Sequence, residues 1–276
     1  MKAKKAVVAV VGVLLVGNVV CAQRTDFILE GTEHLNVTTL RGTGVLWDFS
    51  TATVLSGGDI SGVYVNDEAS LSLNSGGVGM AWVYNAGHIN LTGSTVRGSI
   101  LAYNASTVDI AGGKVTQRVS AYDTSAVDIF GGSTLSLDTY DDSSAVLSTG
   151  SVGNLLAFGT SNVEISGGDV SFVNAYDTSA VDISGGVVSG LSARDTGSIT
   201  LHGYDFRATG GIVLDGTRVM GTGLLSGKWF DGTAWAAPVY TNEAGASIFI
   251  PEPATLGLLA LGGLALLRRR RIARRV

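Results

Sequence analysis

The nonapeptide AYDTSAVDI occurs twice in this chain, at residues 121–129 and again at residues 175–183, and the two copies begin 54 residues apart. Aligning the copies extends them to a longer unit, roughly V-D-I-x-G-G-x-V-x-x-x-x-A-Y-D-T-S-A, which recurs every 17 to 19 residues. The identical copies are therefore three repeats apart. Because such a short unit cannot bury an apolar face alone, it must stack on its neighbours, which restricts the chain to a repeat architecture.

Two apolar columns run through the repeats, two residues apart. Each column has one polar member, Thr53 in the first and Ser148 in the second, which we interpret as a small defect. The alternation of apolar, polar and apolar residues is the period of a strand with one buried face. The first column contains Leu35, Thr53, Leu71, Ile89, Val108, Val127, Val146, Val163, Val181 and Ile199, and the second contains Val37, Leu55, Leu73, Leu91, Ile110, Ile129, Ser148, Ile165, Ile183 and Leu201.

Each strand is followed by a corner rich in glycine, a second and looser strand, and a corner rich in Asp and Asn. Glycine permits the positive φ of a tight corner, and Asp and Asn favour turns by bonding nearby backbone groups. We therefore predict an all-β chain whose body is a β-solenoid, or β-helix, of about nine coils of 17–19 residues. At about 4.8 Å per coil, such a rod is roughly 43 Å long.

A third column is aromatic and is flanked by Asn66 before it and by Arg194 after it. One interpretation is an exposed stripe on which sugar rings stack. The other is a stabilising ladder of aromatic side chains, worth about 0.2–1 kcal/mol per pair, and we favour this one because solenoids repeat whatever fits a layer. The column consists of Tyr84, Tyr103, Tyr122, Tyr140, Phe158 and Tyr176.

The N-terminal residues 1–22 combine three Lys, a short apolar run and a small residue, Ala22, at the end. This order predicts a signal peptide that signal peptidase removes, and the run is short for the alternative, an uncleaved membrane anchor. Cleavage removes Cys21, the only cysteine, so the mature protein has no disulfide and no thiolate site.

The remaining sequence argues against several chemistries. Residues 23–250 hold 22 Asp and Glu against 9 Lys and Arg, an acidic balance that disfavours nucleic-acid binding. The nearest match to a calcium-binding β-roll motif, GGVGMA, has Ala81 where the Asp ligand belongs. His34, His88 and His202 are far apart and form no zinc motif. Without these motifs we expect no metal and no cofactor. We also expect no catalytic residues, because the units are too uniform in length to contain a cleft-forming insertion.

After Leu201 the two columns stop, and residues 202–250 predict a small C-terminal β cap. Within it, Asp231-Gly232 predicts a hairpin turn between strands that contain Trp229 and Trp235. Residues 23–34 predict a cap at the other end, because an uncovered terminal coil offers unpaired backbone groups to other chains.

The C-terminal residues 251–276 begin with Pro251, Glu252 and Pro253, continue with the uncharged run of residues 254–267, and end in arginines. The run predicts a short hydrophobic helix, and the arginines beside it should stay cytoplasmic. This segment resembles a PEP-CTERM sorting signal, whose stop cluster here is Arg268, Arg269, Arg270 and Arg271. The resemblance implies an exosortase as partner, a transient anchor in the inner membrane, and an association with extracellular polysaccharide.

These observations lead us to expect an exported, non-enzymatic structural protein of the cell surface or extracellular matrix. The alternatives are a carbohydrate-binding adhesin that uses the aromatic column and, third, a polysaccharide-degrading enzyme. The expected organisation is signal peptide 1–22, N-terminal cap 23–34, solenoid 35–201, C-terminal cap 202–250 and sorting segment 251–276.

Overall fold

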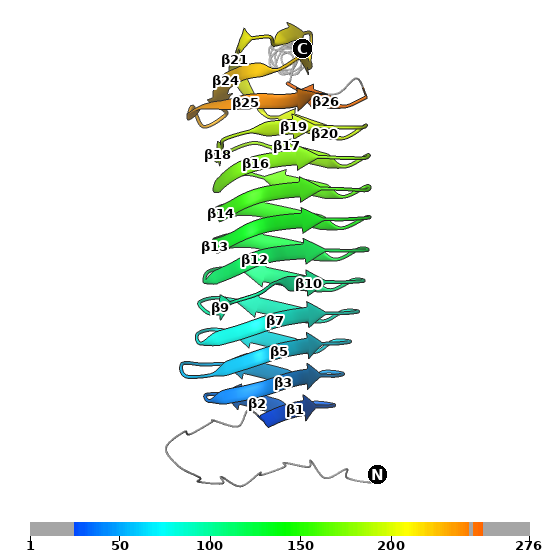
Figure 1. Ribbon diagram of the computed structural model, residues 1–276, viewed down its shortest axis with the longest axis vertical. Coiled ribbons are helices and arrows are strands. Elements are labelled where there is room, and N and C mark those ends of the chain that lie inside the picture. The colour runs from blue at the N-terminus through cyan, green and yellow to red at the C-terminus, as the bar shows by residue number, and fades with distance from the viewer. Residues whose placement is uncertain (1–24, 243–244, 251–276) are drawn as a thin grey trace, which may run out of the picture.

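The computed structural model describes residues 25–242 and 245–250, so the signal peptide, the sorting motif and its hydrophobic helix lie outside the described residues. The described chain forms one continuous sheet of 26 strands, which winds into a rod (Figure 1). The rod has about 10 turns, which confirms the predicted β-solenoid. Among the described residues there is no helix long and apolar enough to cross a membrane.

Two walls of parallel strands form the rod, and each coil contributes one strand to each wall. The strands β13 and β14 turn a corner and run through both walls. The first wall contains β2 (His34–Val37), β4 (Thr51–Val54), β6 (Ser70–Leu73), β8 (His88–Leu91), β11 (Thr107–Ile110), the first parts of β13 (Ala126–Thr139) and β14 (Ser144–Ala157), β15 (Asn162–Ile165), β17 (Ala180–Ile183), β20 (Ser198–Leu201) and β26 (Ser247–Phe249). The second wall contains β1 (Thr25–Leu29), β3 (Leu40–Leu46), β5 (Asp59–Val65), β7 (Gly77–Val83), β10 (Ile100–Ala102), β12 (Lys114–Ala121), the later parts of β13 and β14, β16 (Asp169–Ala175), β19 (Leu191–Ala193) and β25 (Ala234–Asn242), with the short β9 (Thr95–Val96) and β18 (Val187–Val188) beside it.

The two predicted apolar columns are the buried faces of the first wall, but their register was wrong at two coils. Leu35 and Leu71 both pair with Ala52, not with Thr53. Likewise Val127 and Val163 pair with Ala145, and Val146 faces solvent. A slip of one residue moves a side chain to the opposite face of a strand.

The corrected register also changes the second column. Val54 and Leu147 are fully buried there, in the places predicted for Leu55 and Ser148. Neither column therefore has a polar defect.

The second wall is a parallel stack like the first, with a register shift within β12. It buries further apolar columns that the predicted looser strand did not reveal. The most regular column consists of Val63, Ala81, Ile100, Val119, Leu137, Leu155, Val173 and Leu191.

The predicted cap is an insertion within a last coil. The column that ended at Ile199 resumes at Ile248, because β26 pairs in parallel with β20. Between them lie β21 (Gly203–Gly210), β22 (Val213–Asp215), β23 (Arg218–Met220) and β24 (Gly223–Trp229), which pair antiparallel. The antiparallel strands β21 and β24 lie at the end of the rod beyond β25 (Figure 1).

At the opposite end, the segment predicted as a cap contains β1, which pairs in parallel with β3 as the first strand of the second wall.

The predicted hairpin between Trp229 and Trp235 is present, with Gly232 at φ 90° in its turn. The two indole rings stack with their centroids 4.8 Å apart, and both side chains are buried. This pair forms the apolar centre of the cap.

Candidate functional site

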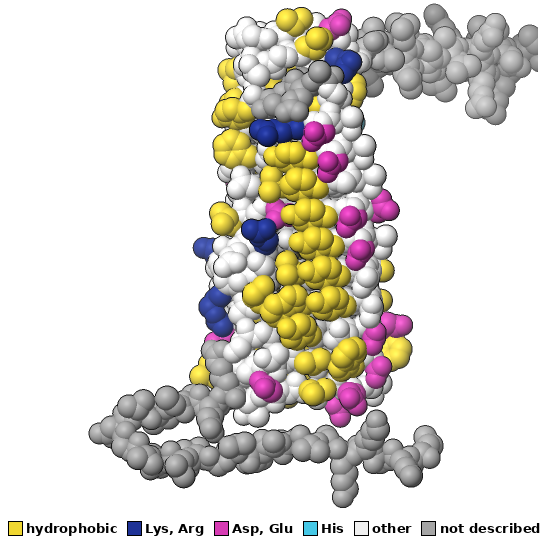
Figure 2. Space-filling view, turned by 45° about the vertical axis from the view of Figure 1, so that its right-hand side comes forward, with side chains coloured by type: hydrophobic (Ala, Val, Ile, Leu, Met, Phe, Trp, Pro, Cys, Tyr) yellow, Lys and Arg dark blue, Asp and Glu magenta, His cyan; other side chains and the backbone are white. Residues whose placement is uncertain are grey.

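The aromatic column lies on the outer face of the second wall, where its six rings form one continuous stack. Neighbouring ring centroids are 4.7 to 5.0 Å apart, and the ring planes differ by only 4 to 10°. An apolar stripe follows the long axis of the rod in Figure 2, beside a row of acidic side chains. The four rings inside the stack therefore have both faces covered by other rings, and they expose their edges and, in the three tyrosines, their hydroxyl groups.

The two residues predicted to flank the column do so. At one end, the guanidinium of Arg194 lies 5.8 Å from the centroid of the Tyr176 ring, within the range of a cation–π contact. At the other end, Asn66 is buried, and its Nδ2 donates to the carbonyl of Leu46 at 3.1 Å.

Three hydroxyl groups of the column have a raised pKa. Burial raises the pKa of Tyr84, of Tyr103 and of Tyr140, and the neighbouring tyrosines add to the effect. These three phenols therefore stay protonated at neutral pH, and each can donate a hydrogen bond.

The repeated nonapeptide builds the corner beside this column. Asp123 adopts a left-handed conformation with φ 58°, as do the Asp or Asn residues at the other predicted corners. Its carboxylate accepts a hydrogen bond from the backbone N–H of Asn104 at 2.8 Å, so it links two coils, where we expected a bond within one corner. Ser125 accepts from the N–H of Tyr122 at 3.0 Å and donates to the carbonyl of Ala102 at 3.3 Å.

The Asp and Ser side chains of the nonapeptide thus link its corner to the preceding coil. The second copy repeats the arrangement, since Ser179 accepts from Tyr176 and donates to Ala157.

The sequence pattern did not reveal a second aromatic pair and a polar cluster on the same wall. The ring centroids of Tyr64 and Trp82 are 4.7 Å apart, and this stacked pair lies on the same outer face, two residues earlier along the strand than the aromatic column. Their spacing of 18 residues was the available signal.

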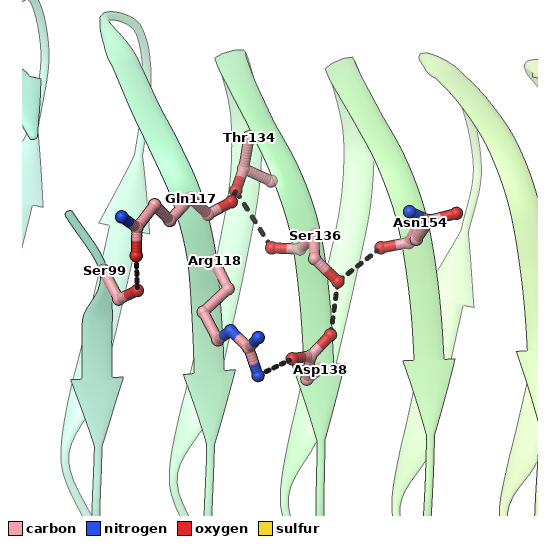
Figure 3. Close-up of polar contacts among 7 residues, drawn as sticks. All are labelled: Ser99, Gln117, Arg118, Thr134, Ser136, Asp138 and Asn154. Carbon is pink, nitrogen blue, oxygen red and sulfur yellow. Dashed lines mark hydrogen bonds and ion pairs between the residues drawn. The ribbon is translucent and has the colours of Figure 1, made fainter. Parts of the chain in front are cut away.

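The polar cluster is centred on Asp138, which is only 1% exposed (Figure 3). Its carboxylate accepts a hydrogen bond from Ser136 and lies 3.4 Å from Nη1 of Arg118. Burial raises the pKa of Asp138, and the bond from Ser136 and the charge of Arg118 partly offset the rise. The cluster contains Ser99, Gln117, Arg118, Thr134, Ser136, Asp138 and Asn154.

The outer face of the first wall is acidic instead of aromatic. Asp109 and Asp128 are direct neighbours there, and burial, with the charge of Asp109, raises the pKa of Asp128. His88 lies 3.7 Å from Asp109, and His202 lies 2.9 Å from Asp182. Within the described residues, no three His, Cys, Asp or Glu side chains are grouped closely enough to hold a metal ion.

Residues 249–271 match the PEP-CTERM protein-sorting motif. The search of curated proteins found no match, and neither did the search of solved structures. The predicted sorting residues Pro251, Glu252, Pro253 and Arg268–Arg271 fall within the matched range but outside the described residues. The motif indicates an exported protein that an exosortase sorts by way of a membrane anchor, and the body that it carries is a β-solenoid.

Proposed function

We propose that this protein is a non-enzymatic structural rod, which exosortase sorting delivers to the cell surface or the extracellular matrix. The observation that carries the proposal is the stacked aromatic column. Stacking of a sugar on an aromatic side chain requires a free ring face. In this column neighbouring rings cover both faces of the four inner rings and one face of each end ring, so the column supports a role in holding coils together.

The corners support the same proposal. The repeated Asp, Thr and Ser side chains have backbone partners in the adjacent coil; Thr124, for example, donates to the carbonyl of Asn104 at 3.0 Å. Side chains that link coils in this way are engaged in the rod itself.

A glycan array tests the proposal against the adhesin alternative. We expect no binding by the wild-type body, and none by variants with Tyr122→Ala or Tyr176→Ala. Binding to a polysaccharide that both substitutions abolish, while Tyr122→Phe retains it, would establish the adhesin instead. Turnover of any polymer in a broad polysaccharide panel would establish the enzyme.

Intact mass and cell fractionation test the sorting step. The full chain is expressed with and without an exosortase. We expect a species that lacks residues 1–22 and the arginine tail only where the exosortase is present. An inner-membrane species that keeps residues 268–276 in both hosts contradicts exosortase processing.

A further inference from the structure

The capped end of the rod has almost no spacer between it and the sorting segment. Ile250 is buried, and its N–H donates to the carbonyl of Thr217 at 2.7 Å, so the chain is still held by the fold at this residue. The uncharged run begins at residue 254. Four residues extend at most about 14 Å.

This reach limits how far the end of the rod can lie from the lipid: it exceeds the thickness of one headgroup layer by at most about 6–9 Å. The headgroup layer on each side of a bilayer is about 5–8 Å thick, since the hydrocarbon core takes about 30 of 40–45 Å. The uncharged run has 14 residues, which as a helix is about 21 Å long and does not fill the core. Such a mismatch draws the flanking residues towards the membrane.

The last strands of the rod carry exposed apolar side chains. Beyond β26 and β25 lie β23 and β22 on the first wall and β24 and β21 on the second. Val213 and Met220 face each other across β22 and β23 and are 60% and 50% exposed. On the second wall, Tyr204 and Leu224 are each 44% exposed. We call these four residues the terminal collar.

The charge of the rod changes at the same place. Residues 25–193 hold 17 Asp and Glu against 4 Lys and Arg, whereas residues 194–250 hold 5 against 4. Beside the collar, Lys228 and Arg207 lie 3.4 and 3.5 Å from Asp205, and Arg218 is opposite Asp215 in the antiparallel pairing of β22 and β23. Lipid phosphates therefore repel the long acidic body much more than the nearly neutral end.

We propose that the terminal collar rests in the lipid headgroup layer while the protein is anchored. Strand layers are about 4.8 Å apart, so a headgroup layer covers one to two of them, which are the layers that carry the collar. Aromatic and apolar side chains with nearby basic groups are favoured at this depth. The proposal rests on the anchoring that the sorting motif implies.

An environment-sensitive fluorophore tests the contact. The full chain with Cys21→Ser, purified from a host without exosortase, is reconstituted in phosphatidylethanolamine–phosphatidylglycerol vesicles and labelled at Met220→Cys or Leu224→Cys. Leu135→Cys, on β13 in the middle of the rod and 60% exposed, is the matched control. We expect several-fold stronger quenching by headgroup-labelled lipid at the collar than at the control.

Each result decides between the possibilities. Equal quenching at the three positions, in vesicles that retain the chain after alkaline extraction, overturns the collar contact and leaves the sorting proposal intact. Loss of the chain on extraction overturns both. Shielding of the collar only when exosortase is added assigns the surface to that protein, not to lipid.

A spacer variant gives an independent measurement. Ten Gly and Ser residues inserted after Ile250 add about 17 Å of reach. We expect collar quenching to fall to the control value while the chain stays anchored, and unchanged quenching contradicts the spacer argument.

Discussion

The indole Nε1 of Trp229 donates a hydrogen bond of 2.9 Å to the carbonyl oxygen of Gly186, 43 residues earlier in the chain. In the coil below, the equivalent carbonyl of Gly168 accepts from the backbone N–H of Val187 at 2.8 Å. The cap side chain thus takes the place of the backbone donor that the next coil would provide. Covering a terminal coil in this way removes an unpaired acceptor from the exposed end of a solenoid.

Replacement of Trp229 by Phe should therefore destabilise the protein by about 1–2 kcal/mol, because the acceptor loses its partner while most of the apolar contact remains. Trp235→Phe is the matched control, since the Nε1 of Trp235 is buried without a hydrogen-bond partner. We expect that change to be neutral or slightly stabilising. Urea unfolding of both variants measures the difference, and equal destabilisation would show that ring size, not the hydrogen bond, matters.

The aromatic column predicts a cost that depends on position. Tyr122→Ala removes two ring contacts, with Tyr103 and Tyr140, and should cost about 1–3 kcal/mol. Tyr122→Phe keeps both contacts and should cost little. Thermal unfolding distinguishes them, and a harmless Tyr122→Ala would remove the case for a stabilising ladder.

The left-handed corners predict an order among substitutions at Asp123. Asp123→Asn keeps both the conformation and an acceptor for the N–H of Asn104, so it should be nearly neutral. Asp123→Gly keeps only the conformation, which Gly159 already adopts at an equivalent corner with φ 67°. Asp123→Ala keeps neither and should be the least stable, with a conformational cost of about 1–2 kcal/mol. Chemical denaturation of the three variants checks the order, and Ala at least as stable as Gly contradicts it.

The repeat period could be predicted from sequence because each coil places similar residues in a similar environment. The register error at Ala145 arose because the neighbouring Val146 is larger and more apolar. At Ala52, Val54 and Leu55 both fit the second column, and the regular step of 18 residues pointed to Leu55 and hence to Thr53. Coil lengths of 17 to 19 residues allow such a slip without a visible break. The return of the first wall at Ile248 was hidden, because an insertion of four strands separates it from Ile199.

The polar cluster was equally hidden, since Asp138 occupies an outward position that its neighbours in space happen to cover. The alternation of apolar and polar residues assigns a residue to one face of the sheet. It does not show which neighbouring outward side chains cover that residue. Only the contacts with Arg118 and Ser136 reveal a buried carboxylate there.

This burial predicts a dependence of stability on pH. The pKa of Asp138 is raised in the folded state, so the folded protein keeps this proton at a pH where the unfolded chain has lost it. The side chain therefore carries no penalty in strong acid. From about pH 4 upward the unfolded state ionises first, and the contribution of Asp138 to stability falls until the folded carboxyl has also ionised.

Asp138→Asn should remove this loss, because Asn is uncharged and can still accept the bond from Ser136. We expect its advantage in the free energy of unfolding to be small in acid and to grow towards neutral pH, with the exposed Asp142→Asn as control. Denaturation at a series of pH values measures the gap between variant and wild type. A variant that becomes less stable than wild type as the pH rises would show that the ion pair with Arg118 outweighs the burial of the charge.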